Sequence, residues 1–316
     1  MRRAYELGRR VWPGAGGGRG RRGFTRAQLF ACLVVREALR LSYRRAEAFL
    51  ADVPGWLAEV GLARAPDHNT LWRAFASLLA KRRVGRALDL MALDAAGELR
   101  AGLRAKPLAI DSTCYGPRHR SRHYDRACRK MDLRPGRKYA QRHGKYGPAV
   151  NASRSRELRR MPQLALAAAA AGHRVLAAVA SAGNGSDAPD FEPLLYHAWR
   201  RAPVKAVVAG PGYDSEANHR IARLDMGVRP VIPAKIGRPS ASPPAGRYRR
   251  LMKARFARKA DARLYGQRPQ VEAVHSMMKR NPGEYLRSVL TPRRKQEMLL
   301  RAVVHNLMLA GDSRRQ

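Results

Sequence analysis

The stretch YGQRPQVEAVHSMMK, which begins at Tyr265, contains one acid, Glu272, among several basic side chains that could bind phosphate. Pro269 favours the first turn of a helix, so we expect a helix to begin near Arg268. Lys279 follows Glu272 by two helical turns, which places both side chains on one face. Tyr265 and Arg268 precede this acid by seven and four residues, so one helix edge would present a metal-binding acid beside phosphate-binding groups. An exposed amphipathic helix would give the same pattern by chance.

A second candidate acid, Asp111, follows the apolar stretch KPLAI and precedes Ser112 and Thr113. This stretch predicts a short buried strand that ends at Asp111, and sites commonly form at the carboxyl edge of such strands. A structural alternative is that Asp111 only caps a turn with its two hydroxyl neighbours. We predict that Asp111 and Glu272 fold together into a pocket that binds a cation.

Composition indicates a polyanionic partner. The chain has 316 residues, with 63 Lys and Arg against 24 Asp and Glu, which gives a formal net charge of +39. Arg predominates over Lys, and its planar guanidinium group matches phosphate, so we expect nucleic acid as the partner. A packaging or ribosomal protein would share this charge balance. However, 45% of the residues are hydrophobic, which indicates a folded core rather than a basic tail.

Cysteine use and hydropathy predict a cytoplasmic, nucleoid-associated protein without membrane insertion. Three cysteines without a C-x-x-C pair suit a reducing compartment, and no apolar run is long enough to span a bilayer. Cys114, His119, His123 and Cys128 could be drawn as a zinc site. Their spacing is not that of a familiar zinc finger, so we do not favour this interpretation.

The sequence up to residue 104 predicts a flexible arm followed by helices. Residues 1–24 are rich in Arg and Gly and are expected to be unstructured. Residues 25–104 show helical periodicity behind capping residues such as Thr25, with a linking helix near 84–104. Short helices with tight turns could form a DNA-binding domain of the helix-turn-helix kind, or a plain helical bundle.

Beyond residue 104 the apolar period changes toward two, which predicts strands. The stretches KPLAID, QLALAAAA, RVLAAVASA, KAVVAG and RPVIPA predict five of them, with helices after the third and fourth. This order predicts an α/β domain over 105–311, with an RNase H-like mixed sheet and flanking helices, and a tail at 312–316. Basic insertions at 116–160 and 235–263 are either DNA-tracking surfaces or solvated loops.

Several blocks together resemble the bacterial insertion-sequence DDE transposases with the YREK signature. The spacing Y-x2-R-x3-E-x6-K from Tyr265 to Lys279 resembles that signature, and AIDST at Asp111 resembles the first catalytic block. SYRRAEAFL, PDHNTLWRAF, GSDAPDFEPLL and GYDSEANHR resemble further blocks in the same order. The resemblance implies an RNase H-like core in which three acids bind two Mg²⁺ or Mn²⁺ ions, and which cuts and joins DNA at terminal inverted repeats.

The resemblance also assigns roles to single residues. It implies that Asp111 and Glu272 are catalytic metal ligands. It implies that Lys279 contacts phosphate, and that Tyr265 and Arg268 position DNA. The expected partner is double-stranded DNA, both transposon ends and target, and the expected assembly is a homodimer in the synaptic complex.

One block departs from the family pattern. The fourth strand is expected to run into A-D-x-G-Y-D, whereas this chain has AGPGYD, so Gly210 stands where the second catalytic acid belongs. Either Asp214 reaches back to replace that ligand, or the chain is a catalytically inactive, transposase-derived DNA-binding protein. We favour impairment, because such sites need their groups placed to within about 0.5 Å. A nuclease of the same fold that does not transpose is a further alternative.

Overall fold

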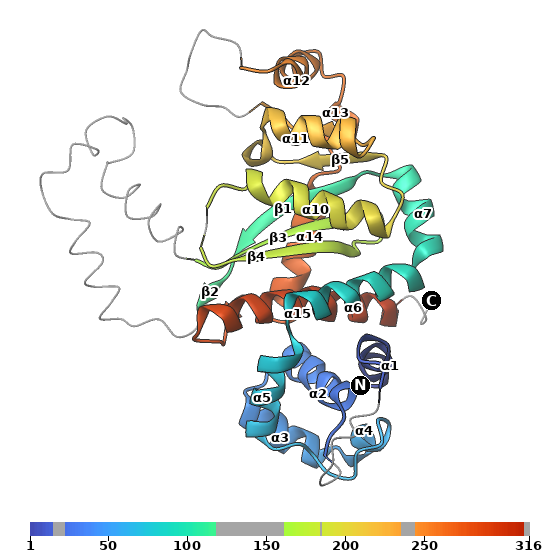
Figure 1. The fold of residues 1–316 in the computed structure, drawn as a ribbon, viewed down its shortest axis with the longest axis vertical. Coiled ribbons are helices and arrows are strands. Elements are labelled where there is room, and N and C mark those ends of the chain that lie inside the picture. Colours follow the sequence, from blue (N-terminus) through green and yellow to red (C-terminus); the bar gives the residue numbers. More distant parts are fainter. Residues whose placement is uncertain (15–22, 118–160, 184, 235–243, 313–316) are drawn as a thin grey trace, which may run out of the picture.

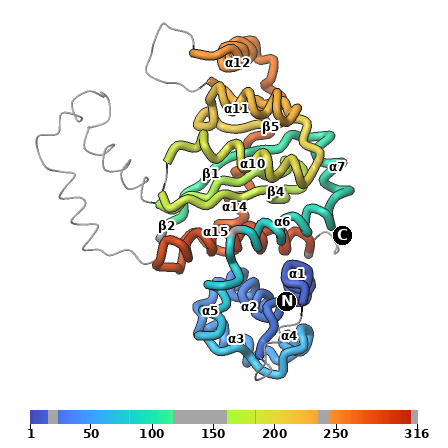
Figure 2. The backbone as a smooth tube through the Cα atoms, in the orientation of Figure 1, coloured from blue at the N-terminus to red at the C-terminus, as the bar shows by residue number. Residues whose placement is uncertain are grey.

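The computed structural model describes residues 1–14, 23–117, 161–183, 185–234 and 244–312. Figures 1 and 2 show an α/β part built around a twisted sheet and a helical part that contains the N-terminus. The long helix α15 (Thr291–Asp312) lies between them. Side chains of α15 enter the cores of both parts, so this helix joins the two.

The central sheet has five strands in the order β4-β3-β1-β5-β6. Its members are β1 (Leu108–Cys114), β3 (Gln163–Ala169), β4 (Val175–Ser181), β5 (Ala206–Ala209) and β6 (Arg229–Val231). In this sheet β3 pairs antiparallel with both β1 and β4, whereas β1, β5 and β6 run parallel. The predicted RNase H-like mixed sheet is therefore confirmed. A separate parallel pair joins β2 (Gly116–Pro117) to β7 (Tyr285–Leu286).

Helices cover both faces of the sheet. On one face lie α7 (Ala96–Ala105) and α10 (Ala188–Arg201); on the other lie α12 (Arg247–Ala257), α14 (Pro269–Arg280) and α15. Successive side chains of a strand point to opposite faces. Leu108 and Ile110 therefore enter the core under α10, while Ala109 enters the core under α14. By the same alternation, Asp111 belongs to the α14 face and Ser112 to the α10 face.

The remaining helices are short, and four of them are capped by polar side chains. They are α1 (Arg2–Val11), α2 (Arg26–Ala38), α3 (Tyr43–Asp52), α4 (Pro54–Ala58), α5 (His68–Leu78), α6 (Lys81–Asp94), η1 (Pro211–Tyr213), α11 (Glu216–Arg220), the π-helical turn η2 (Ile221–Asp225) and α13 (Ala262–Tyr265). Thr25 forms a capping box with Gln28, and Ser42, Asp67 and Ser215 accept hydrogen bonds from the first turns of their helices.

The structure corrects the expected flexible arm at residues 1–24. Arg2–Val11 forms α1, and its side chains at Ala4, Leu7 and Val11 are buried against α2. These three residues recur at helical spacing, which the high Arg content obscured. Residues 15–22 lie outside the described part of the chain.

Other boundaries differ from the sequence expectations. The single linking helix near 84–104 is instead two helices, and α6 already begins at Lys81. The basic insertion at 235–263 contains α12 and the start of α13 in its described portion. Most of the insertion at 116–160, together with three members of the Cys/His cluster, lies outside the described residues. Within the described residues, no helix has the length and apolar character that crossing a bilayer requires.

Candidate active site

The structure brings Asp111 and Glu272 to one guanidinium group. Arg268 places Nη2 2.8 Å from Asp111 Oδ2, and Nη1 2.8 Å from Glu272 Oε1. Both acids also border a cavity of about 490 Å³ between β1 and α14. It is lined by Asp111, Ser112, Thr113, Glu272, His275, Ser276, Lys279, Arg280 and Glu284. The predicted meeting of the two distant acids is therefore found, and Arg268 and Lys279 lie with them.

The position of Asp111 follows from strand pairing. The structure places this residue inside β1 rather than at its end, because pairing with β3 continues from Asp111↔Leu166 to Cys114↔Gln163. Pairing with β5 is parallel and ends at Ile110↔Ala209. Asp111 is thus the first residue of β1 beyond the carboxyl end of its parallel neighbour, where a side chain can reach a cavity.

Charge balance in the cavity depends on Arg268. Burial raises the pKa of Asp111, and the Arg268 guanidinium opposes that shift. Burial disfavours the charge of Arg268, but the carboxylates of Asp111 and Glu272 outweigh it and raise the Arg268 pKa. The three groups together carry a net charge of −1, because one cation offsets two anions.

Gly210 borders the same group of side chains. It is the residue after Ala209, so it lies beside Asp111 at the carboxyl ends of two parallel strands. A Cβ atom at Gly210 would lie 3.4 Å from Arg268 Nε and 3.5 Å from Arg268 Nη2, which are ordinary contact distances. The Nε atom of Arg268 is buried, with no hydrogen-bond acceptor among the described residues. A carboxylate on residue 210 would therefore meet the guanidinium that already binds both acids, next to an unsatisfied donor.

Asp214 lies in a different environment. Its side chain is fully buried, and its carboxylate is 2.8 Å from Arg249 Nη2 on α12 and 3.3 Å from His219 Nε2 on α11. The neighbouring Glu216 accepts hydrogen bonds from backbone N–H groups in the first turn of α12. Both acids therefore hold α12 against α11. The structure argues against the expectation that Asp214 replaces the acid missing at Gly210.

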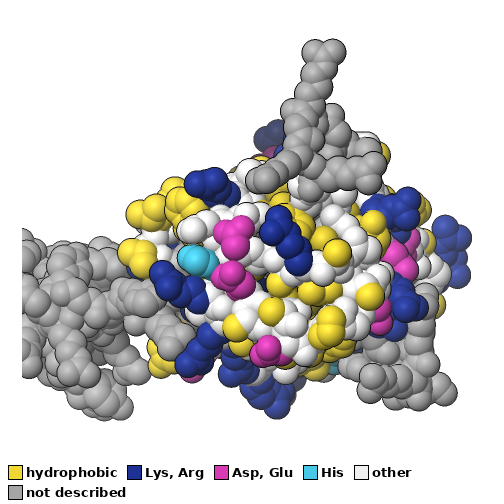
Figure 3. Space-filling model, turned by 90° about the horizontal axis from the view of Figure 1, so that it is seen from below, with side chains coloured by type: hydrophobic (Ala, Val, Ile, Leu, Met, Phe, Trp, Pro, Cys, Tyr) yellow, Lys and Arg dark blue, Asp and Glu magenta, His cyan; other side chains and the backbone are white. Residues whose placement is uncertain are grey.

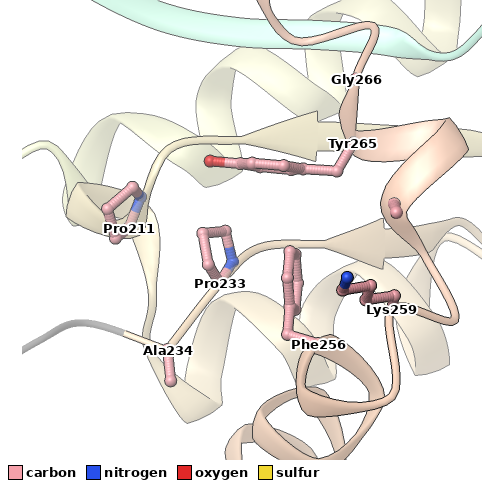
Figure 4. A pocket seen from close by; sticks show the side chains of 8 residues that line it. Pro211, Pro233, Ala234, Phe256, Lys259, Tyr265 and Gly266 are labelled. Atoms are coloured by element: carbon pink, nitrogen blue, oxygen red, sulfur yellow. The ribbon is translucent and has the colours of Figure 1, made fainter.

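Tyr265 lies outside the helix that carries Glu272, which begins near Arg268 as expected. It ends α13, and α14 begins only at Pro269. Its ring extends toward Pro211 across a second, mostly apolar cavity of about 510 Å³, with Phe256 on the opposing side (Figure 4). The Phe256 and Tyr265 rings pack edge to face at 5.1 Å. Because Pro211 follows Gly210, this cavity adjoins the site.

Two further contacts could not be assigned from sequence. His275 on α14 is buried, and its Nε2 lies 3.3 Å from the backbone oxygen of Asp111; burial lowers its pKa to about 4. Its place one turn after Glu272 was the only signal for it. Asp187 occupies the N-cap position of α10, but its carboxylate accepts hydrogen bonds from Ser112 and Gln163 on the α10 face. This contact stabilises β1 from the side opposite Asp111.

The described residues do not fit a pair of divalent ions. Such ions prefer several oxygen ligands, whereas this site offers two carboxylates whose charge Arg268 already balances in part. Among the residues that the structure describes, no three His, Cys, Asp or Glu side chains are grouped to hold a metal. A side chain at Gly210 could reach Arg268 without a steric clash, so residue 210 is the position from which a third carboxylate would join Asp111 and Glu272.

Comparison with known families gives one match. A sequence model of the family described as "Transposase DDE domain" matches residues 106–307, which include both acids and Gly210. No curated protein matches the chain.

Proposed function

The chain belongs to the family of transposase DDE domains, and from this premise we propose that it binds the terminal inverted repeats of an insertion sequence. We further propose that its metal-dependent DNA strand cleavage and transfer are impaired. The family as a whole uses divalent metal ions and acts on DNA. The formal net charge of +39 supports a DNA partner, because cationic side chains that neutralise phosphates release counterions on binding.

The observation that carries the proposed impairment is the surroundings of Arg268. This guanidinium binds Asp111 and Glu272 and leaves Nε without an acceptor on the side that faces Gly210. A third carboxylate at residue 210 would change the net charge of the group from −1 to −2 and add oxygen ligands. Without it the pocket attracts a divalent cation less strongly and holds it in a less defined geometry. This site therefore favours the interpretation that the chain is a decayed copy of a transposase that still binds DNA.

Several side chains are suited to hold DNA at the pocket. We assign Lys279 to a backbone phosphate, because it borders the cavity beside both acids. We assign Arg268 and Tyr265 to positioning the strand, since Arg268 lies between the acids and Tyr265 borders the adjoining cavity. Synapsis of two transposon ends would bring two copies of the chain together, so a homodimer is the expected assembly on DNA.

The helical part is the proposed DNA-reading domain. Its helices α2, α3 and α5 pack together, and α5 exposes Trp72, with 51% of its surface accessible, beside the exposed Arg73. Figure 3 views this end of the molecule, where Lys and Arg side chains alternate with acidic and hydrophobic ones. This mixed surface suits reading of specific bases better than uniform phosphate attraction.

The experiment that tests the proposed function compares the natural chain with Gly210→Asp on a duplex that carries the ends of the encoding element. With Mg²⁺ or Mn²⁺, we expect Gly210→Asp to nick the terminal repeat about a hundredfold faster than the natural chain, because misplacing one group costs about that factor. Binding measured by gel shift should be equal for both.

Two matched controls separate charge from shape. Gly210→Asn has nearly the shape of the Asp variant without its charge, and we expect it to remain as slow as the natural chain. Asp111→Ala in the Gly210→Asp chain should abolish nicking. Rapid nicking by the natural chain, abolished by Asp111→Ala, would overturn the proposed impairment, and absence of binding to either repeat would overturn the proposed function itself.

A further inference from the structure

Lys279 has an unusual setting for a lysine in an acid-containing pocket. It borders the cavity with Asp111 and Glu272, yet among the described residues it forms no ion pair with a carboxylate. Its ammonium nitrogen instead lies 5.6 Å from the centre of the Tyr115 ring. An aromatic face attracts a cation through its quadrupole without neutralising it. A lysine held in this way keeps its full charge for an anion that enters the cavity.

Tyr115 is placed with little freedom. It directly follows β1, its backbone N–H donates to the Pro162 oxygen at 2.8 Å, and its ring is completely buried. The next residues, Gly116 and Pro117, form β2 and pair with β7. A Cβ atom at Gly116 would lie 2.7 Å from the Tyr285 ring, so a larger residue here would displace that ring. The ring therefore offers Lys279 a fixed surface.

A second cation fixes the ring from another segment. The Arg301 guanidinium lies 4.9 Å from the centre of the Tyr115 ring and is itself fully buried on α15. It donates to Glu37 Oε1 of α2 at 2.9 Å and to Glu297 Oε1 at 3.0 Å. These acids offset part of the Arg301 charge, so it repels Lys279 less than an unpaired guanidinium would. Contacts thus run from the helical part through Arg301 and Tyr115 to Lys279.

We propose that Tyr115 is a positioning residue that holds the uncompensated Lys279 ammonium at the cavity to bind a backbone phosphate of DNA. This inference rests on the proposed DNA-binding function and extends it to a residue outside the family signature. Lys279 faces the ring of Tyr115, whereas the nearest side-chain partner of the Tyr115 hydroxyl is Arg301, so we assign the positioning of Lys279 to the ring face.

The first test measures DNA affinity at several salt concentrations by fluorescence anisotropy. Tyr115→Phe keeps the ring and should bind within about twofold of the natural chain, whereas Tyr115→Leu removes it and should bind about three- to tenfold more weakly. Lys279→Met should lower affinity and reduce the slope of log K against log salt by about 1. In the Lys279→Met chain, Tyr115→Leu should have no further effect.

The control lysine is Lys253, which is exposed on α12. Tyr115→Leu should lower affinity equally in the natural and Lys253→Met chains. An undiminished loss in the Lys279→Met chain would show that Tyr115 acts only through packing, and would overturn the proposal.

If Tyr115→Leu does not fold, phenylalanines with one, two and three ring fluorines replace Tyr115 instead. Their quadrupoles weaken stepwise at nearly constant shape, so affinity should fall stepwise, and constant affinity would refute the proposal.

A DNA-independent measurement separates this proposal from the proposed function. In selectively labelled protein, ring current from Tyr115 should shift the terminal Lys279 side-chain protons upfield in the free chain, and Tyr115→Leu should remove the shift. Random-coil shifts in the natural chain would overturn the positioning role even if DNA binds. Upfield shifts in a chain that does not bind DNA would confirm the contact between Lys279 and Tyr115 but refute the proposed DNA-binding function.

Discussion

Replacing Glu37 with glutamine should destabilise the protein strongly, because three arginines share this buried carboxylate. Glu37 is fully buried on α2, and its oxygens lie 2.6 Å from Arg287, 2.9 Å from Arg301 and 3.4 Å from Arg36. Glutamine keeps the volume but removes the charge, so the guanidinium groups remain buried, and among the described residues only Glu297 is left to pair with one of them. Breaking a buried ion pair by removing one partner costs about 3–5 kcal/mol.

This cost can be read from thermal unfolding. With an unfolding entropy of about 2.1 cal/mol/K per residue, a chain of 316 residues loses about 1.5 °C of Tm per kcal/mol, so Glu37→Gln should lower Tm by about 5–8 °C. The matched control is Glu59→Gln, which removes an exposed pair with Arg2 at 3.7 Å and should cost at most about 1 kcal/mol. Differential scanning calorimetry of the two variants measures the difference. Equal Tm values for both variants would refute the assignment of Glu37 as the anion that compensates this cluster.

The same residue predicts a pH dependence. Burial raises the pKa of Glu37, but Arg301, Arg287 and Arg36 outweigh it, so the folded-state pKa lies below the ordinary 4.5. A depressed carboxyl pKa contributes stability above the unfolded value, and that contribution is lost as pH falls through the folded value. The natural chain should therefore lose more Tm than Glu37→Gln when pH is lowered from 5 toward 3. Parallel curves for the two proteins would contradict the predicted charge state.

Other consequences follow from the same contacts. DNA binding should weaken steeply with salt, and a flat plot of log K against log salt would refute binding through many phosphates. Asp214→Asn should lower Tm, because it removes the buried partner of Arg249, yet leave Mn²⁺ affinity unchanged; a loss of metal affinity would restore Asp214 as a ligand. Gly116→Ala should lower Tm, because the added methyl group would displace the half-exposed Tyr285 ring. An unchanged Tm would show that the close contact between β2 and β7 does not contribute to stability.

Local rules account for the parts of the fold that the sequence predicted well. Thr25, Ser42 and Ser215 cap helices as their side-chain chemistry requires. The five strands were recognisable because apolar period and turn residues agreed, and Gly172 and Gly227 adopt the positive φ angles that their turns need. Helix α1 escaped prediction because arginines stand at its start and near its end, and an Arg- and Gly-rich stretch follows it.

Sequence spacing predicted which two acids belong to the site, but it did not predict their contacts. Asp111 and Glu272 were identified from separate blocks, but nothing in the sequence indicated that Arg268 would bind both acids. The register Ile110↔Ala209 is a long-range property, and it alone places Gly210 beside Asp111. Of the two alternatives for the missing acid, the one that used Asp214 did not foresee its buried ion pair with α12, because that contact lies beyond any local pattern.

The contacts around Tyr115 illustrate the same limit. Lys279 and Arg301 come from helices far along the chain, and their distances to the ring follow from how α14 and α15 pack under the sheet. A lone tyrosine after a strand carries no signal of this arrangement. Long-range packing, rather than residue type, determines which side chains act together in this protein.

Calorimetric titration of Mn²⁺ into the natural chain and into Gly210→Asp tests most directly whether residue 210 is the vacant third-acid position of the pocket formed by Asp111 and Glu272. The account predicts that Gly210→Asp binds Mn²⁺ at least about 10- to 100-fold more tightly, and that adding Asp111→Ala removes the gain. Equal Mn²⁺ affinity of the two chains, or a gain that survives Asp111→Ala, would contradict it.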